Sequence, residues 1–224
     1  PGKIICDLAV GLALGGDCLA DITVLRDEPG IYGRVASDPT VSRLIKLLAC
    51  DADRAIAAIG RARKAARETA WRLAGDRSPA ARATVADPLI IDLDATLVTA
   101  HSEKEKAAAT FKRGFGFHPL CAFVDHGPQG TGEPLTILLR AGNAGSNTAA
   151  DHQKVIADAL DQVGLGPRPG RRVLIRIDGA GSTKATLQTL TRRRVGYSVG
   201  FTLPMNTPEL YHLVPEHVWT PAYN

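Results

Sequence analysis

Apolar residues in the first third of the chain recur at every third or fourth position, which is the spacing of one face of an amphipathic helix. One helix is predicted to begin at Asp38 and Pro39, because Asp38 can cap a first turn in which proline's missing N–H has no cost. Its apolar face consists of Val41, Leu44, Ile45 and Leu48. A second helix follows, with an apolar face formed by Ile56, Ile59, Ala66 and Leu73. The pattern therefore predicts an all-helical region at the start of the chain.

The pattern changes near Ser78 and Pro79, where a polar stretch precedes runs of strand-forming residues. We therefore place a domain boundary at residue 80, with a helical region over 1–80 and a second domain over 81–224. Strands are predicted over 88–98, 118–124, 135–140, 171–177 and 195–203, with a turn over 127–132 between the second and the third. Helices are predicted from a cap at Asn147 and Thr148 to a stop at Gly164, and over 182–194.

The predicted order is strand, strand, strand, helix, strand, helix, strand. Three sequential antiparallel strands followed by helix-linked strands give a mixed five-stranded sheet with flanking helices, in the α/β class. The same order is found in ribonuclease-H-like nucleases and integrases. In such a sheet the first and fourth strands lie side by side, so that Asp94 and Asp178 would meet. A fold by itself does not define a function, so the function must be inferred from the side chains.

The composition is that of a globular protein, since 224 residues with 45% hydrophobic content are enough to bury a core. No run approaches the roughly 18 apolar residues of a membrane span, and the first residues do not have the pattern of a signal peptide. The cysteines are too widely spaced for a zinc or redox motif. We therefore expect a cytoplasmic protein with no membrane partner. Because the chain starts at Pro1 and stops at Asn224 without a final element, we expect a piece of a longer protein.

Positive charge is concentrated in one segment. Residues 40–83 contain ten basic and four acidic side chains, whereas residues 1–39 contain three and six. Such a segment attracts a phosphate backbone through a salt-sensitive interaction, although a solvated helix face has the same charge pattern. Aromatic and basic side chains are also interleaved over residues 111–118, where ordinary strand alternation is the alternative explanation. The candidate DNA-binding residues are Arg43, Lys46, Arg61, Arg63, Lys64, Arg67, Lys112 and Arg113.

Two aspartates interrupt apolar strands. Asp94 lies in the first predicted strand and shares a face with Asp92, because strand side chains alternate with a period of two. Asp178 follows the fourth predicted strand, where capping of the next turn is the alternative role. A buried free carboxylate is unfavourable, and carboxylates from two strands suit Mg²⁺. We therefore predict that Asp94 and Asp178 are metal ligands and catalytic residues, and that Asp92 has a supporting or solvent-facing role.

Gly179, Gly181 and Lys184 lie between a predicted strand and a predicted helix. The order of residues in a phosphate-binding loop is absent, and so is the third glycine of a dinucleotide-binding motif. We therefore predict a tight turn in which Ser182 caps the following helix.

Several blocks of sequence resemble the transposases of bacterial insertion sequences that have an Asp-Asp-Glu catalytic triad. The matching blocks are 15–21 (GGDCLAD), 37–43 (SDPTVSR), 94–96 (DAT), 116–120 (GFHPL), 139–143 (LRAGN) and 176–178 (RID). The resemblance covers nearly the whole chain and implies a ribonuclease-H-like fold in which Asp94 and Asp178 are the first two acids of the triad. The third, a glutamate on a later helix, would lie beyond Asn224, because Glu209 and Glu216 have proline-broken surroundings.

The resemblance also implies an activity, which is metal-dependent cleavage of DNA strands at transposon ends and their transfer to a target. The implied cofactor is Mg²⁺, with Mn²⁺ as a substitute. One ion would activate water and later a DNA 3′-hydroxyl, while a second would stabilise the leaving oxygen and Asp94 would bridge both. The implied partners are double-stranded DNA, as terminal repeats and target, and a second copy of the protein in a synaptic homodimer. Such a protein would be associated with the bacterial nucleoid.

Two other functions fit parts of the sequence. The segment 92–98 (DLDATLV) also resembles the first motif of haloacid-dehalogenase-like phosphatases, in which Asp92 would be the nucleophile and Asp94 the acid/base. That fold requires an alternating parallel sheet and a late magnesium motif with paired acids, and the sequence has neither. The other alternative is a non-catalytic transposase fragment that holds DNA through its basic helices.

Overall fold

The computed structural model describes residues 1–128, 130–166 and 168–221. The chain forms two compact units, Pro1–Ala62 and Arg63–Asn224. The division falls inside the long helix α5 (Ala52–Ala74), which is earlier in the chain than the boundary predicted at residue 80. Within the described residues, no helix combines the length and the apolar character needed to cross a membrane.

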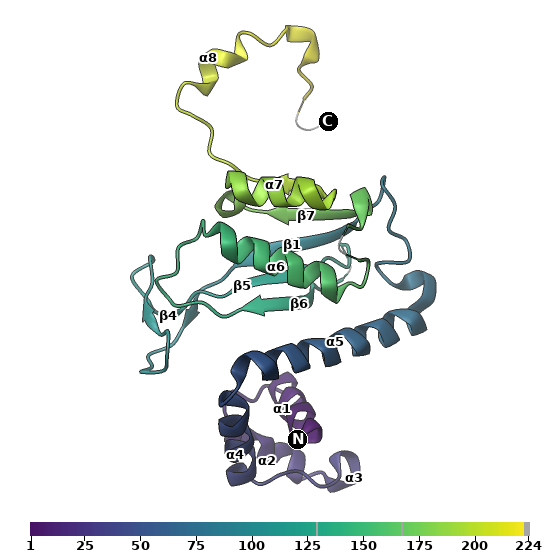
Figure 1. Cartoon of the computed structure of the whole chain (residues 1–224), viewed down its shortest axis with the longest axis vertical. Coiled ribbons are helices and arrows are strands. Elements are labelled where there is room, and N and C mark those ends of the chain that lie inside the picture. Colours follow the sequence, from purple (N-terminus) through teal and green to yellow (C-terminus); the bar gives the residue numbers. More distant parts are fainter. Residues whose placement is uncertain (129, 167, 222–224) are drawn as a thin grey trace. The chain divides into compact units, whose positions relative to one another are not determined.

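The first unit is helical, as predicted. It contains α1 (Gly2–Ala13), a 3₁₀ turn (Leu19–Ile22), the short helices α2 (Thr23–Arg26) and α3 (Pro29–Tyr32), α4 (Asp38–Ala49) and the first part of α5 (Figure 1). Its small core consists of the buried residues Ile22, Leu25 and Val41, with Ile4 and Leu8 packed against them.

Helix α4 starts where the sequence predicts, but the predicted cap is wrong. Ser37 is the N-cap residue, Asp38 is already helical, and no side-chain cap bond forms. The Asp38 carboxylate instead accepts a hydrogen bond from Arg26 Nη2 at 2.8 Å. Val41 and Leu44 are buried on the predicted apolar face, whereas Ile45 is exposed.

The second unit contains a mixed five-stranded sheet with the strand order β6-β5-β1-β7-β8 (Figure 1). The strands are β1 (Leu89–Ala95), β5 (Leu120–Val124), β6 (Glu133–Leu138), β7 (Val173–Ile177) and β8 (Gly196–Val199). β1, β5 and β6 form an antiparallel meander, while β7 and β8 are added in parallel to β1. The predicted fold class is therefore confirmed, including the contact between the first and fourth of these strands. Gln129, in the predicted turn between β5 and β6, lies outside the described residues.

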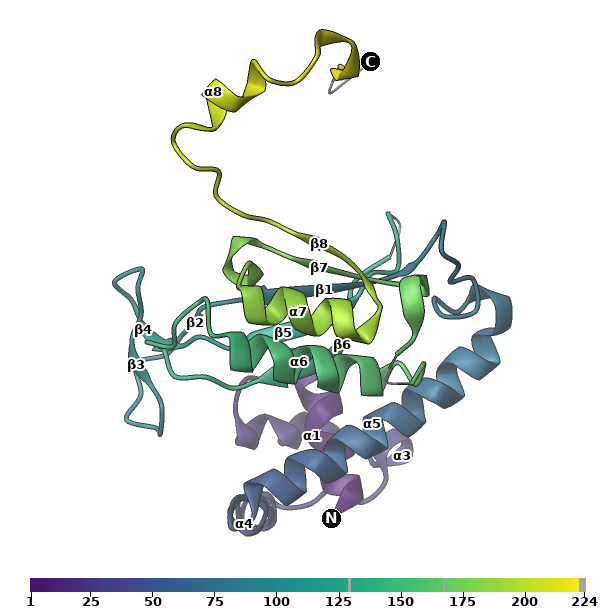
Figure 2. The same ribbon diagram turned by 45° about the horizontal axis from the view of Figure 1, so that its top comes forward.

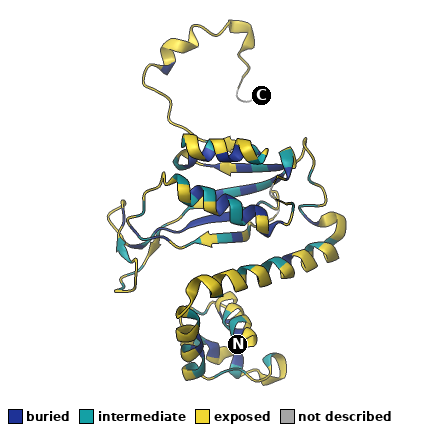
Figure 3. Ribbon diagram, in the orientation of Figure 1, coloured by how far each residue is buried: buried dark blue, intermediate teal, exposed yellow. Residues whose placement is uncertain are grey.

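Helices α6 (Ala149–Gln162) and α7 (Lys184–Arg193) cover one face of this sheet (Figures 1 and 2). Alternate residues of β1 point into the core between sheet and helices, and Figure 3 shows the buried positions. Leu89, Ile91 and Leu93 are at most 3% exposed. Because side chains alternate along a strand, Asp92 and Asp94 point to the opposite face.

The starts of α6 and α7 differ in detail from the prediction. Thr148 is the N-cap residue of α6, but its side chain forms no cap bond. Thr183 caps α7, and its hydroxyl accepts a hydrogen bond from the N–H of Thr186 at 3.2 Å. The predicted cap, Ser182, instead donates its hydroxyl to the Gly179 carbonyl at 2.8 Å, so this prediction was wrong by one residue.

A second, three-stranded sheet follows β1, and the sequence analysis missed it. Its strands β2 (Val98–Thr99), β3 (Ala108–Ala109) and β4 (Phe115–Phe117) are arranged in the order β2-β4-β3. Strands of two or three residues are too short for alternation to be recognised in a sequence. The predicted first strand over 88–98 is therefore two strands, separated after Ala95.

Two glycines allow this small sheet to pack closely. A Cβ atom on Gly142 would lie 2.3 Å from the Ala108 carbonyl oxygen and 2.4 Å from that of Gly116. Gly116 itself has φ +151° and would bring a Cβ within 2.0 Å of the Val98 carbonyl oxygen. No side chain fits at either position, because these contacts are with backbone atoms.

Replacement of Gly142 by alanine is therefore expected to lower the free energy of unfolding by about 1–3 kcal/mol, the usual range for overpacking. Gly145→Ala is the matched control, since a Cβ there meets only the Thr148 hydroxyl at an ordinary 3.5 Å. Urea unfolding of both variants measures the difference. Equal stabilities of the two variants would contradict the close approach at Gly142.

The second half of α5 is bound to the edge of the main sheet by a partly buried polar cluster around Glu133. Arg67, only 7% exposed, donates from Nε to Glu133 at 2.5 Å and from Nη1 to Gln162 Oε1 at 2.7 Å. Trp71 Nε1 and His126 Nε2 lie 3.1 Å from the other Glu133 oxygen. Burial raises the pKa of Glu133, but these hydrogen bonds lower it more, so its pKa lies below the ordinary value. This cluster explains why α5 belongs to the second unit from Arg63 onward.

Replacement of Glu133 by glutamine is expected to reduce the free energy of unfolding by about 2–3 kcal/mol at pH 7, because the buried Arg67 loses its counter-charge. Since the pKa of Glu133 is lowered in the folded state, the wild-type chain keeps this contribution above about pH 4.5 and loses it as the pH falls further. The difference between wild type and variant should therefore narrow below pH 4.5. Urea unfolding across a pH series measures it, with the exposed Glu103→Gln as control. A difference that does not change with pH would contradict this role.

Candidate active site

The two predicted catalytic aspartates occupy matching positions on neighbouring strands. β1 and β7 pair in parallel, with Leu93 opposite Ile177 at the end of the ladder, and Asp94 and Asp178 are the next residue on each strand. Leu93 and Ile177 are buried in the core, so Asp94, the next residue of β1, points to the opposite face, and Asp178 follows directly after the end of β7. Adjacent strands are about 4.8 Å apart. The structure therefore brings Asp94 and Asp178 side by side at one edge of the sheet.

Each of these carboxylates already has one local hydrogen bond. Asp94 Oδ1 accepts from the N–H of Ala95 at 2.8 Å, and Asp178 Oδ1 accepts from the N–H of Ala180 at 3.0 Å. The second bond caps the 3₁₀ turn Gly179–Gly181, which is the tight turn that the sequence predicts. Because an ionised carboxylate has two oxygens and about four acceptor sites, capping leaves Asp178 able to bind a cation as well.

Cys121 lies opposite Asp94 in the β1–β5 pair. Burial raises the pKa of the Cys121 thiol, and the negative charge of Asp94 raises it further. The site therefore presents a neutral thiol beside Asp94, which adds no charge to the acidic pair.

Asp92 is bound by an arginine that the sequence analysis did not single out. Arg176 is the β7 partner of Asp92 and donates to both of its oxygens, from Nε at 2.5 Å and from Nη2 at 2.6 Å. Nη2 also donates to Asp125 at 2.8 Å. The hydrogen bond to Asp92 raises the pKa of Arg176, which stays charged. Both oxygens of Asp92 are thus occupied, unlike those of a free nucleophile, and nothing in the structure favours the phosphatase alternative.

The candidate DNA-binding residues separate into two groups. Arg67 is buried against Glu133, so its assignment to a DNA surface was wrong. Arg63 donates to the Pro134 carbonyl and its pKa is lowered by burial, while Lys64 pairs with Asp161 at 2.8 Å. The charge pattern could not show these partners, because they lie some 70 to 100 residues further along the chain. The side chains that remain exposed are Arg43, Lys46 and Arg61 in the first unit and Lys112 and Arg113 in the second.

Lys112 and Arg113 lie in the turn between β3 and β4 of the small sheet. The Lys112 ammonium is 5.8 Å from the centre of the Phe111 ring, and Phe111 is 68% exposed. Arg113 has a left-handed backbone, with φ +61°, which tightens the turn. An exposed aromatic ring next to two cations is a combination that suits stacking and phosphate contacts.

Among the described residues, Asp17, Cys18 and Asp21 form a group of three whose possible ligand atoms lie within 4.8 Å of one another. The Asp21 carboxylate accepts hydrogen bonds from the N–H groups of Cys18 and Asp17, and these bonds lower its pKa. Asp21, the third residue of the 3₁₀ turn Leu19–Ile22, therefore forms a capping box with the N-cap residue Cys18, and this is the physical role of this part of the block 15–21.

Glu209 and Glu216 do not resemble a third catalytic acid. Glu209 is in the five-residue helix α8 (Thr207–Tyr211), and Glu216 starts a three-residue 3₁₀ turn (Glu216–Val218). Both side chains are exposed, in agreement with the expectation from the sequence.

A mixed sheet in this strand order, with acidic side chains at the matching ends of two parallel neighbours, defines the class of ribonuclease-H-like domains. A family model described as "Transposase DDE domain group 1" matches residues 1–223. The chain therefore belongs to this family of DDE transposases. Enzymes of this kind depend on a divalent metal ion.

Two solved structures are similar to part of the chain. The first, a pre-cleavage Mos1 transpososome, is 14% identical over 66% of this chain and 44% of that one, with a TM-score of 0.32. The second, a Mos1 transposase paired-end complex with the left transposon end, is 13% identical over 94% and 80%, with a TM-score of 0.33. The chain thus spans less than half of the length of the first structure. A comparison with curated proteins found no match.

Proposed function

We propose that the chain provides the first two acids, Asp94 and Asp178, of the catalytic site of a DNA transposase that cuts and joins strands at transposon ends. The observation that carries the proposal is the parallel β1–β7 pair, in which Asp94 and Asp178 are the residues next after the last paired positions, Leu93 and Ile177. The third acid is expected on a later helix, as in the triad that the family is named after.

The donor set fits a divalent metal of the hard kind. Asp94 and Asp178 offer oxygen ligands only, each keeps one carboxylate oxygen free of the hydrogen bonds described above, and Mg²⁺ prefers a few carboxylates together with water and phosphate. We infer that Mg²⁺ is the ion, with Mn²⁺ as a substitute of similar ligand preference. Bound there, the metal would activate the attacking oxygen and stabilise charge on the leaving oxygen.

Arg176 has a positioning role in this proposal. Asp92 is two residues from Asp94 on the same strand face, about 7 Å away, and would compete for the metal if its charge were free. Arg176 binds both Asp92 and Asp125, occupies both oxygens of Asp92 and offsets one of the two negative charges. The free carboxylates at this edge are then Asp94 and Asp178, which favours a single position for the ion.

The proposed partners are the terminal repeats of a transposon, a target duplex and a second copy of the protein in the synaptic complex. Arg43, Lys46 and Arg61 of the first unit, and Lys112 and Arg113 beside Phe111, supply exposed cations for the phosphate backbone. Such a protein acts where its DNA lies, in the cytoplasm at the bacterial nucleoid.

The test is strand cleavage by the full-length protein on a linear duplex that carries the ends flanking its own gene. Nicks at these ends that appear with Mg²⁺ or Mn²⁺, and disappear with EDTA, are the expected result. Tight DNA binding without cleavage under either metal would favour a non-catalytic protein. Release of phosphate from p-nitrophenyl phosphate would favour a phosphatase instead.

A further inference from the structure

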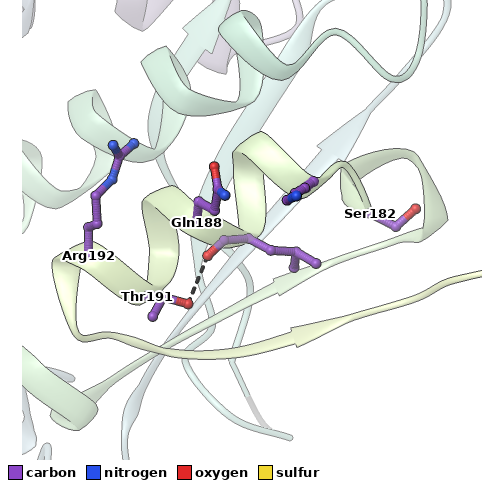
Figure 4. A pocket seen from close by; sticks show the side chains of 6 residues that line it. Ser182, Gln188, Thr191 and Arg192 are labelled. Carbon is purple, nitrogen blue, oxygen red and sulfur yellow. Dashed lines mark hydrogen bonds between the residues drawn. The ribbon is translucent and has the colours of Figure 1, made fainter.

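A shallow groove runs along the outer side of α7, close to the proposed active site in sequence. Figure 4 shows side chains that line it, and its volume is about 680 Å³. The groove begins at Ser182, four residues after Asp178, and follows the helix for two turns. The lining residues are Ser182, Lys184, Leu187, Gln188, Thr191 and Arg192.

These residues form one continuous stripe of the helix. Positions 184, 187, 188, 191 and 192 have the spacing of a single helical face, as side chains three and four residues apart are neighbours. Lys184 and Arg192 stand at the two ends of the stripe with Gln188 between them. Eight residues at about 1.5 Å each separate the two cations by about 12 Å along the helix axis.

The charge of the groove is positive. Its lining residues include the cations Lys184 and Arg192 and no acidic residue. Lys184 and Arg192 are exposed, and in the described part of the chain neither forms an ion pair. Arg192 Nη2 donates to the Thr189 hydroxyl at 3.1 Å, which leaves other N–H groups of the guanidinium for a partner.

The lining also matches the chemistry of a nucleic-acid backbone. The Gln188 amide is a neutral hydrogen-bond donor, and Leu187 offers apolar surface to a sugar, whereas the hydroxyl groups of Ser182 and Thr191 already donate to the carbonyls of Gly179 and Leu187. A duplex carries one phosphate charge per about 1.7 Å of its axis, so two cations about 12 Å apart contact different phosphates. Contacts of this kind position DNA and carry no sequence information.

We propose that this α7 groove binds the backbone of duplex DNA, independently of its sequence. The inference rests on the proposed function, since it assigns to the same DNA substrate a second contact surface. The occupant is duplex DNA, because the groove combines the cations Lys184 and Arg192 with the neutral amide donor of Gln188 and has no acidic side chain among its lining residues.

The test compares two double variants that lose the same charge. Lys184→Gln with Arg192→Gln removes both cations of the groove, whereas Arg171→Gln with Arg172→Gln removes two exposed cations before β7, at the opposite end of that strand from Asp178. Fluorescence anisotropy with a labelled 40-base-pair duplex of arbitrary sequence, over a salt series, gives the slope of log affinity against log salt. Each lost phosphate contact reduces the magnitude of that slope by about 0.9. The magnitude for the groove variant should therefore be smaller than that of wild type by about 1.8, and the slope of the control variant should equal that of wild type.

A second measurement tests the same proposal without changing the charge of the groove. A photo-crosslinking residue placed at Gln188 should crosslink to the duplex, and crosslinks to a second copy of the chain instead would overturn the proposal. If wild type binds the duplex and the groove variant keeps its slope, the groove proposal fails while the proposed function stands. If wild type does not bind the duplex at any salt concentration, the DNA partner itself, and with it the proposed function, is wrong.

Discussion

Replacement of Asp94 or of Asp178 by asparagine in the full-length protein is expected to reduce metal-dependent DNA cleavage by about 10³-fold or more, because a carboxylate ligand of the ion is lost. Asparagine is the informative replacement, since its carbonyl oxygen can still accept from the N–H groups of Ala95 and Ala180. The turn and the strand end then keep their hydrogen bonds and only the charge is removed. A role limited to capping would leave cleavage intact.

Asp87→Asn is the matched control for these variants. Asp87 is an exposed aspartate just before β1, at the opposite end of the strand from Asp94. Gel analysis of end cleavage in Mg²⁺ measures the activity, and anisotropy with the same duplex measures binding, which should stay within about twofold because the phosphate contacts come from cations elsewhere. Cleavage by either Asp94→Asn or Asp178→Asn at the rate of the control would refute the site.

Arg176→Gln is expected to lower cleavage by about 10²-fold at limiting Mg²⁺, the size of effect seen when a group that orients metal ligands is removed. The variant leaves Asp92 and Asp125 without their shared cation, and Asp92 then competes with Asp178 for the ion beside Asp94. The additional change Asp92→Asn removes that competitor and should restore most of the activity. Arg176→Lys should retain an intermediate activity, because an ammonium keeps the charge but cannot match both carboxylate oxygens.

The location of the metal distinguishes this role from a structural one. Fe²⁺ bound in place of Mg²⁺ generates hydroxyl radicals that cut the backbone nearby, and in wild type the cuts should fall near residues 94 and 178. In Arg176→Gln they should shift toward 92 and 125, and in the double variant they should return. An unchanged cutting pattern together with reduced activity would mean that Arg176 only stabilises the β1–β7 pair.

The pattern of apolar residues was sufficient to predict the main sheet, because its core strands are long enough for alternation and are separated by clear turns. The contact of β1 with β7 followed from the order of elements. The small sheet was missed because its pairing depends on backbone approaches at Gly116 and Gly142 that no local pattern reveals. The boundary between the units was predicted at residue 80, whereas the division lies after Ala62. The sequence could not show this, because the side chains that bind α5 to the sheet have their partners far along the chain.

The candidate site was predicted only in part. Asp94 and Asp178 could be found because a carboxylate in or just after an apolar strand is conspicuous. Arg176 could have been found in the same way, because it is a charged residue within the apolar strand β7. Once the register is known, Arg176 lies opposite Asp92. Asp125 could not have been found in this way, because it follows β5 and its contact depends on how the chain leaves the strand.

The pairing of β1 with β7 also determines how long the two aspartates of the proposed site keep their relative positions. The spacing between the two aspartates is fixed by main-chain hydrogen bonds in the centre of the sheet, around Ile91 and Ile175, which are both fully buried. Amides in such a position exchange with solvent only when the whole unit opens. The two acidic groups are therefore held in register for as long as the unit stays folded, and substitutions in the surrounding loops and in the small sheet can accumulate without separating them.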